Sequence, residues 1–360
     1  MKHIERLLIV MLLALGMAAC EKPEPEQQQS STVEVDTMHA LVLNEGPQGN
    51  NASLTRIDLA SGTLENDWFA HCNNRGLGNV AQDLIVYGSK AYITVWKSGT
   101  LEVVDTATGI STQVSLGNRG PRYLAADGGK LYISCYNPRS VIRIDTATLQ
   151  IEATCTLGNY NPEGIAIAAG KLFVVSSWIG ETQSSITYDD KVYVVDLATF
   201  ANPTPIVVGS NPQRVEAIDE NTLIVNCWGA WNMNTGTTEG EGSALIDATT
   251  LAVTQTGQLL SRMTVDHGMV YGCASTYDAS WNMTTSYMKI DPVTLIVTPI
   301  LTSCGINNPY SIGVHPVSGD IYIGTDGNYS TNGDLYCFRS DGTQQWKREV
   351  GQLPSKIVFY

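Results

Sequence analysis

The sequence has little positive charge. Lys and Arg together number 21, against 35 Asp and Glu in 360 residues, which gives a formal net charge of −14 at pH 7. No patch or stripe of basic residues is present that could neutralise a phosphate backbone, so the composition excludes a nucleic-acid partner. Phe is also scarce, with 5 residues against 16 Tyr and 7 Trp. Rings that carry a polar group suit binding surfaces as well as cores.

The motifs that usually mark catalysis or metal binding are missing as well. The chain contains no Gly-x-Ser-x-Gly, no His-Glu-x-x-His and no Cys-x-x-Cys, and its five His have no metal-ligand spacing to one another. We therefore expect neither enzymatic activity nor a metal site. The segment Asp326–Asp334 alternates oxygen-bearing side chains as a calcium loop does, but the distal bidentate glutamate is absent, and we expect no calcium there.

Long apolar runs are limited to one, at the N-terminus. Lys2 and Arg6 precede the run LLIVMLLALG, and small residues and Cys20 follow it, which is the order of a secretory signal peptide. The ending MAAC resembles a bacterial lipobox. We therefore expect residues 1–19 to be a lipoprotein signal peptide and Cys20 to carry the lipid. The alternative is an ordinary signal peptide with an incidental cysteine.

The segment that follows Cys20 is polar and has no apolar periodicity. It reads EKPEPEQQQSS, so residues 20–37 are expected to form the lipidated cysteine and a disordered tether. Its early acidic residues resemble the signal that exports Bacteroidetes lipoproteins to the outer face of the outer membrane. This resemblance implies an outer-membrane location facing the cell exterior, with the lipid as the sole attachment to the membrane.

Seven cysteines remain after Cys20, an odd number that cannot pair completely within the chain. Cys135, Cys227 and Cys273 stand at equivalent places, at the ends of the apolar runs YISC, IVNC and VYGC. Repeated placement of this kind predicts small buried core residues rather than a disulfide framework.

An internal repeat predicts the architecture. Seven short sequences end an apolar run with Asp, followed by a turn that contains Thr or Gly, and their spacings are 40–51 residues. That period matches a four-stranded propeller blade. An Asp at this place suits a hairpin turn closed by its own carboxylate, so we expect these aspartates to be structural. They are Asp58, Asp105, Asp145, Asp196, Asp247, Asp291 and Asp341.

The two ends of the repeat region complement each other. The chain enters the first unit at HALVLNEG, which has the pattern of a second strand, and it ends with LPSKIVFY, which has the pattern of a first strand. Pairing these two strands in one blade closes the ring and removes an open sheet edge. The sequence therefore predicts an all-β fold, a single seven-bladed β-propeller over residues 38–360, and no helix signal competes with this prediction.

A family resemblance accompanies this repeat. The segment KLYISCYNPRSVIRIDTATLQIEATCTLGNYNPEGIAI resembles the YVTN-type propeller repeat of surface-layer and YncE-like proteins. The segments LNEGPQGNNASLTRID, LGNVAQDL and GPRYL resemble a group of Bacteroidetes surface lipoproteins that includes BtuG-like proteins. The resemblance implies capture of cobalamin at the cell surface and its delivery to a TonB-dependent outer-membrane transporter.

Candidate site residues follow from propeller geometry. The first strand of each blade lines the channel, and the segment before it opens on the same face as the loop between strands two and three. First strands and the segments before them offer Arg122, Tyr123, Glu163, Arg214, Arg262 and Tyr310, together with Gln82, Asp83, Gln213 and Lys356. The loops after second strands offer Trp96, Tyr136, Trp178, Trp228, Trp231, Tyr277 and Trp281.

Structural roles for these residues remain open alternatives. Aromatic residues at the end of a second strand can simply pack between blades, as for Trp96, and the channel arginines can form salt bridges with Asp83 and Glu163. In the polar loop Asn226–Gly242, Trp228 holds a repeat position. Trp231 and Met233 belong to an insertion that the repeat does not require, and the phrase Trp-Asn-Met recurs from Trp281.

A face that combines rings with Arg, Gln and Asn suits a large, flat ligand that bears amides. A corrinoid has this character, and its phosphodiester could be held by Arg. We therefore expect a non-catalytic surface lipoprotein that binds a corrinoid, with cobalamin as transported ligand and no cofactor. The alternatives are a surface-layer or adhesive propeller that binds protein or glycan, and an enzyme resembling lactonases or quinoproteins.

Overall fold

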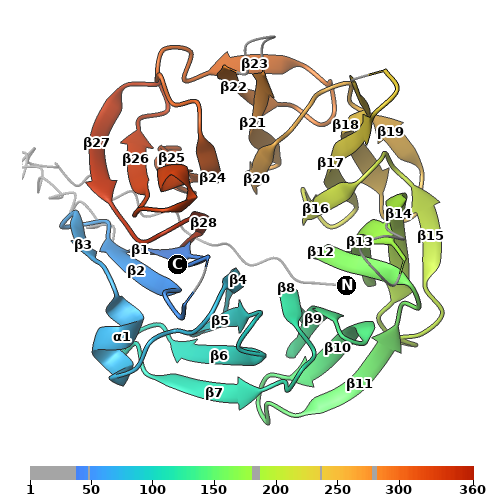
Figure 1. Cartoon of the computed structure of the whole chain (residues 1–360), viewed down its shortest axis with the longest axis horizontal. Coiled ribbons are helices and arrows are strands. Elements are labelled where there is room, and N and C mark those ends of the chain that lie inside the picture. The colour runs from blue at the N-terminus through green and yellow to red at the C-terminus, as the bar shows by residue number, and fades with distance from the viewer. Residues whose placement is uncertain (1–37, 48, 181–186, 236, 278–281) are drawn as a thin grey trace, which may run out of the picture. The chain divides into compact units, whose positions relative to one another are not determined.

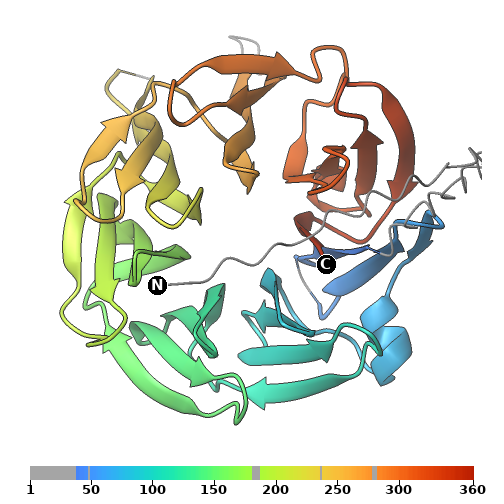
Figure 2. The ribbon, with the colours of Figure 1, turned by 180° about the vertical axis from the view of Figure 1, so that it is seen from behind.

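Seven small sheets surround a central channel. The computed structural model describes residues 38–47, 49–180, 187–235, 237–277 and 282–360, and these residues form seven four-stranded antiparallel sheets (Figure 1). The sheets are arranged as the blades of a propeller, which confirms the fold predicted from the repeat. Figures 1 and 2 show from both sides that the first strand of each blade lies nearest the axis.

The first blade joins the two ends of the repeat region. It contains β28 (Pro354–Phe359), β1 (His39–Asn44), β2 (Ser53–Asp58) and β3 (Thr63–Glu65), in that order from the axis outward. The strand β1 pairs with β28 from Ala40, opposite Phe359, to Leu43, opposite Lys356. The predicted closure is therefore confirmed, and β1 has no unpaired edge on the channel side.

Each other blade contains four consecutive strands. Blades 2 to 4 contain β4 (Ala81–Tyr87), β5 (Lys90–Val95), β6 (Thr100–Asp105), β7 (Ser111–Ser115), β8 (Pro121–Asp127), β9 (Lys130–Tyr136), β10 (Arg139–Asp145), β11 (Ile151–Thr156), β12 (Tyr160–Ala168), β13 (Lys171–Ile179), β14 (Thr187–Asp196) and β15 (Thr204–Val207). Blades 5 to 7 contain β16 (Pro212–Ala217), β17 (Thr222–Asn232), β18 (Thr237–Asp247), β19 (Val253–Gln255), β20 (Arg262–Asp266), β21 (Met269–Tyr277), β22 (Met283–Ile290), β23 (Val297–Ile300), β24 (Pro309–Val314), β25 (Ile321–Thr325), β26 (Asp334–Phe338) and β27 (Gln344–Glu349).

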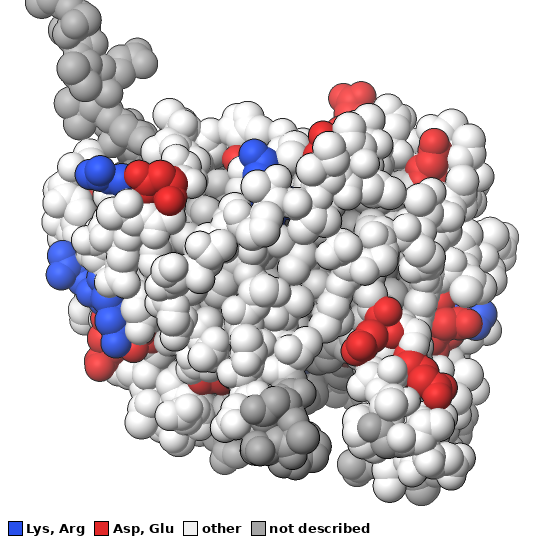
Figure 3. Space-filling model, turned by 90° about the horizontal axis from the view of Figure 1, so that it is seen from above, with Lys and Arg blue, Asp and Glu red and all other residues white. Residues whose placement is uncertain are grey.

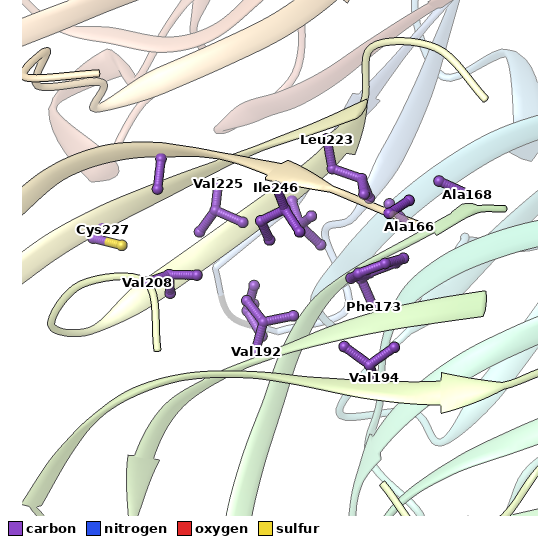
Figure 4. Packing of buried hydrophobic residues seen from close by; sticks show 14 residues of the cluster. Ala166, Ala168, Phe173, Val192, Val194, Val208, Leu223, Val225, Cys227 and Ile246 are labelled. Atoms are coloured by element: carbon purple, nitrogen blue, oxygen red, sulfur yellow. The ribbon is translucent and has the colours of Figure 1, made fainter. Parts of the chain in front are cut away.

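The core lies between neighbouring blades rather than inside any one of them. Figure 4 shows Phe173 and Val192 of blade 4 packed toward Val225 and Ile246 of blade 5, and all four are fully buried. Middle strands are covered on both faces by the adjacent blades. They therefore contain long buried runs, and β9 has five consecutive buried residues.

The repeated cysteines belong to this packing. Cys135, Cys227 and Cys273 are each at most 2% exposed, and burial raises the pKa of each thiol to about 12. All seven cysteines after Cys20 are free thiols. The prediction that the three repeated cysteines are small core residues is confirmed.

The seven repeated aspartates close turns, as predicted. Asp105 accepts hydrogen bonds from the backbone N–H of Thr108 at 2.9 Å and from its hydroxyl at 2.8 Å, and the other six accept comparable backbone bonds. Hydrogen bonds to the charged carboxylate lower the pKa of all seven aspartates.

The all-β fold includes one short helix among the described residues that no sequence signal indicated. A short helix, α1 (Trp68–Asn73), links blades 1 and 2, and a single 3₁₀ turn, η2 (Gly327–Tyr329), follows β25. Six residues are too few to be stable alone, and Asp67 caps α1 with no side-chain hydrogen bond. Burial of Trp68 and Phe69 against both blades holds the helix instead. Within the described residues, no helix is long and apolar enough to cross a bilayer.

The outer surface carries charge sparsely. Figure 3 shows Lys, Arg, Asp and Glu scattered singly or in small groups among uncharged residues over the face that it presents. This agrees with a sequence in which 16% of the residues are charged.

Candidate functional site

A cavity of about 400 Å³ opens where the inner strands begin. The ends of second strands reach the same place, because the backbone N–H of Trp96 bonds to Val80 and that of Tyr136 bonds to Gly120. The predicted shared face of these segments is thus confirmed. Eleven of the candidate residues line the cavity, namely Gln82, Trp96, Arg122, Tyr123, Tyr136, Gln213, Arg214, Trp228, Arg262, Tyr310 and Lys356.

Arg122 is fixed in a buried ion pair. Its guanidinium lies 2.8 Å from the carboxylate of Glu163, which is only 5% exposed, and it also donates to the side-chain oxygen of Gln82. The rings of Trp96 and Tyr136 flank the guanidinium at 5.1 and 4.6 Å. The salt-bridge alternative therefore holds for Arg122, and its positive charge is largely used within the protein.

Tyr136 and Glu163 belong to the same cluster. The Tyr136 hydroxyl donates to Glu163, and burial together with the charge of Glu163 raises the pKa of Tyr136 well above its usual range. Trp96 and Tyr136 also contact each other edge to face, with centroids 6.0 Å apart. The rings that line this side of the cavity are consequently held rigidly in place.

Arg262 has different surroundings. Its guanidinium donates to the backbone carbonyls of Tyr310, at 2.8 Å, and Ser261, at 2.9 Å, and no acidic partner is present among the described residues. The ring of Trp228 lies 5.6 Å from the guanidinium, and the ring of Tyr310 lies 5.1 Å from it. Arg262 is therefore positioned by neutral groups, and its charge remains available to the cavity.

Glu45 borders the same part of the cavity. The Tyr310 hydroxyl donates to Glu45 at 2.5 Å, and burial, followed by the charge of Glu45, raises the pKa of Tyr310. Glu45 is not among the candidate site residues expected from the sequence. Its position in the repeat could have identified it as a cavity residue, because Glu45 follows β1 as Trp96 follows β5. In the structure the backbone N–H of Glu45 donates to the carbonyl of Leu353.

Arg214 occupies the deeper part of the cavity. Its guanidinium lies 4.3 Å from the ring centroid of Tyr123 and 4.0 Å from the carboxylate of Asp83. That separation is too long for a hydrogen bond, so the expected salt bridge is loose. Glu216, which lines the cavity too, was also missed by the sequence analysis. The two-residue period of a strand could have identified it, because Glu216 follows Arg214 by two positions on β16 and such residues point to the same face of the sheet.

The remaining candidates do not line this cavity. Trp178 packs on the guanidinium of Arg139 at 4.6 Å, on the rim of blade 4. Trp231 is 51% exposed, and Met233 is 85% exposed. The backbone of Tyr277 pairs with Met283. The described part of the structure does not include the side chain of Tyr277. It also does not include Trp281 or the segment 1–37, which contains Cys20.

The expected loop Asn226–Gly242 is largely strand. The strands β17 and β18 continue past the repeat length, and Trp228 pairs with Glu241 while Trp231 pairs with Thr238. Backbone pairing satisfies the N–H and C=O groups of this polar segment, so its Gly, Thr and Glu residues form a projecting hairpin. Trp228, which holds a repeat position, is the one described residue of this segment that lines the cavity.

The chemistry available in the cavity is mixed in charge and rich in rings. Arginine, lysine, glutamate, tyrosine and tryptophan side chains all reach it. Across the described ranges no group of three or more His, Cys, Asp or Glu is arranged to hold a metal ion. The site can therefore bind a polar organic molecule by stacking and by charge-assisted hydrogen bonds.

Comparisons with known proteins show similarity of fold alone. No protein-family model and no curated protein sequence matches the chain. A quinoprotein alcohol dehydrogenase-like protein from Bacteroides thetaiotaomicron is similar at a TM-score of 0.63 and 15% identity, covering 90% of this chain and 78% of that one. Hydrazine synthase of Kuenenia stuttgartiensis is similar at 0.58 and 18%, covering 74% and 85%. Periplasmic gluconolactonase of Pseudomonas aeruginosa is similar at 0.57 and 13%, covering 89% and 99%.

These similarities correct one expectation. The absence of familiar catalytic motifs led us to expect a protein without enzymatic activity, and that expectation is contradicted by structural neighbours that are named as enzymes, hydrazine synthase and gluconolactonase. Because identities are 13–18% for the three neighbours, they bear on the fold and not on a particular reaction.

Proposed function

We propose that the cavity captures a flat organic ligand that carries an acidic group and amides, and that a corrinoid is the first ligand to test. The observation that carries the proposal is the environment of Arg262. This guanidinium is held by two backbone carbonyls between the rings of Trp228 and Tyr310, with no acidic partner among the described residues. A preorganised cation beside exposed aromatic surface favours a planar molecule with a negative charge.

The corrinoid is favoured by family resemblance and by chemistry. Its amide side chains match the Gln and Tyr groups around the cavity, and its phosphodiester matches Arg262. A cavity of about 400 Å³ would admit only part of such a ligand. The macrocycle would lie across the rim against Trp96 and Trp228, the latter being 43% exposed.

The cellular setting is part of the same proposal. A lipid on Cys20 would tether the propeller to the outer membrane through the segment 20–37, facing the cell exterior. The captured ligand would then pass to a TonB-dependent transporter. This part rests on the sequence MAAC followed by acidic residues, and on the resemblance to surface lipoproteins.

Calorimetric titration with cyanocobalamin tests the proposal. We expect binding at micromolar concentrations or tighter, and Arg262→Ala should weaken it about 10- to 100-fold, because a charge-assisted hydrogen bond contributes about 1.5–3 kcal/mol. The matched control is Arg139→Ala, which removes a stacked guanidinium from Trp178 outside the cavity and should leave the affinity unchanged.

A second ligand separates the contribution of the phosphodiester from that of the macrocycle. Cobinamide lacks the nucleotide and its phosphodiester, so it should bind the wild-type protein and Arg262→Ala with similar affinity. Absence of any heat with both ligands would exclude the corrinoid. A screen of glycans, lactones and quinone cofactors on the same protein then addresses the alternative ligands and substrates.

A further inference from the structure

A group of mostly charged side chains, here called the waist, adjoins the cavity just described. Tyr123, Arg214, Glu216 and Lys356 line that cavity and also a second cavity of about 250 Å³. The two cavities therefore meet at these side chains, which come from β8, β16 and β28. Asp83, on β4, lines the second cavity as well.

Asp83 presents a buried carboxylate oxygen that no protein group satisfies. Its Oδ2 accepts the backbone N–H of Leu124 at 3.0 Å, whereas its Oδ1 has no hydrogen-bond partner among the described residues. The Asp83 side chain is only 5% exposed. Leaving such an oxygen without a donor costs about 1–3 kcal/mol or more, so this atom is suited to accept a hydrogen from a bound molecule.

Two cations flank that oxygen without touching it. The guanidinium of Arg214 lies 4.0 Å from Asp83 Oδ1, and the ammonium of Lys356 lies 3.9 Å from it. Both separations exceed hydrogen-bond length. Within the described part of the chain, neither side chain makes a hydrogen bond to another group, so their N–H donors remain available to the channel.

The guanidinium of Arg214 is nevertheless held in place. It stacks on the Tyr123 ring at 4.3 Å, and the Arg214 backbone N–H donates to the buried side chain of Asn226 at 2.8 Å. The backbone of Lys356 is fixed by β28, where Leu43 of β1 is its pairing partner. Little order has to be imposed on Arg214 when a ligand binds, which favours affinity.

We infer that the waist is a second binding site, for a small hydroxycarboxylate. Its carboxylate would accept hydrogen bonds from Arg214 and Lys356, and its neighbouring hydroxyl would donate to Asp83 Oδ1. A simple carboxylate or an inorganic anion without a proton satisfies the two cations but not the unpaired oxygen. A neutral alcohol satisfies the oxygen but leaves both cations without a counter-charge.

Glu216 adjusts the charge of this site. Its carboxylate accepts the backbone N–H of Val265 at 3.1 Å, and burial raises its pKa. When Glu216 is protonated, Arg214 and Lys356 face a single negative charge, that of Asp83. The waist then has one positive charge in excess, which an acid with one carboxylate neutralises.

The inference goes beyond the proposed corrinoid capture, and its test uses different residues. Thermal shift and calorimetric titration of the whole protein compare L-lactate and D-lactate with propanoate, which has the same carboxylate and no hydroxyl. We expect at least one lactate enantiomer to bind about tenfold more tightly than propanoate, because the hydroxyl pairs with a buried acceptor. Equal affinities, or no binding of any of the three acids, would overturn the inference.

Two variants locate the site. In Asp83→Asn the amide oxygen can still accept the N–H of Leu124, which leaves an NH₂ group toward the waist. This variant should fold and lose the preference for lactate. Lys356→Met should weaken both acids alike, by about tenfold or more. A lactate preference that persists in Asp83→Asn would place the hydroxyl elsewhere and contradict the inference.

A control separates the two proposals. Asp83→Asn should bind cyanocobalamin as the wild type does, and Arg262→Ala should retain the lactate preference. If cyanocobalamin fails to bind the wild type while lactate binds as described, the proposed function fails and the waist site stands.

Discussion

Three arginines reach the channel, and their partners give them different properties. Arg122 has a carboxylate at 2.8 Å, Arg214 has one at 4.0 Å, and Arg262 has none within the described residues. A buried cation with a partner stabilises the fold, whereas a cation without one is available to a ligand. The roles of these residues are therefore distinguished by their neighbours, not by residue type.

This difference predicts that substitutions at the two arginine sites change the free energy of unfolding by different amounts. Glu163→Ala leaves the guanidinium of Arg122, whose side chain is 13% exposed, without its counter-charge. We expect the free energy of unfolding to fall by about 3 kcal/mol or more. Arg262→Ala should change it by about 1 kcal/mol or less. Urea denaturation of both variants measures this, and equal losses would refute the assignment of Arg122 as structural.

At the scale of the element, the turns between third and fourth strands repeat one device. In each of the seven blades an Asp carboxylate bonds to backbone N–H groups two or three residues later. The carboxylate substitutes for a missing backbone partner and fixes the reversal of the chain. Because the charged form makes the bond, the pKa of each of these aspartates is lower in the folded chain.

The turn aspartates predict a dependence of stability on acid. Their folded pKa values lie below the unfolded value of about 4, so the unfolded chain binds more protons as the pH falls. The stabilisation is present above pH ~4 and is lost as the pH falls through the lower, folded values. The melting temperature should therefore drop steeply below pH ~4. Asp105→Asn should show a shallower drop, and an unchanged profile would argue against this cause.

The helix α1 predicts a local packing effect. Phe69 is fully buried between blades 1 and 2 and holds a helix too short to be stable alone. Phe69→Ala should lower the free energy of unfolding by about 3–5 kcal/mol. Trp231→Ala is the matched control, because this large ring is 51% exposed on the β17–β18 hairpin. Its loss should lie within about 1 kcal/mol in the same denaturation experiment.

At the scale of the whole molecule, both ends of the propeller meet in one blade. The strand β28 bonds to β1 and supplies Lys356 to the channel. Ring closure and the waist site therefore depend on the same strand. The fold positions the charged residues of the waist, which come from three blades, around one axis, although they are up to 273 positions apart in the chain, from Asp83 to Lys356.

Removal of β28 tests this dependence. A chain that ends at residue 353 exposes the edge of β1 toward the channel, and we expect a lower melting temperature and self-association through that edge. Size-exclusion chromatography and thermal melting measure both effects. Lys356→Met in the full chain should elute as the wild type does, with nearly unchanged melting. A truncated chain that behaves like the intact one would show that closure contributes little.

The sequence alone determined the periodic features. Seven Asp-containing turns at 40–51 residues set the number of blades, the complementary ends set the closure, and Cys135, Cys227 and Cys273 marked buried core positions in second strands. These features are local and repeated, so each copy of the pattern strengthens the structural prediction made from the other copies. Eleven of the seventeen candidate residues reach one cavity because position within the repeat fixes position relative to the axis.

Only the tertiary structure decided which of those residues are available. Sequence could not show that Glu163 neutralises Arg122 and leaves Arg262 without an acid, or that Trp228 rather than Trp231 lines the cavity. Nor could it show Asp83 lying between Arg214 and Lys356. Such contacts join different blades and depend on side-chain packing across the ring. A repeat pattern specifies where a strand lies, whereas distances of 3 or 4 Å between its side chains and those of other blades arise only when the ring closes.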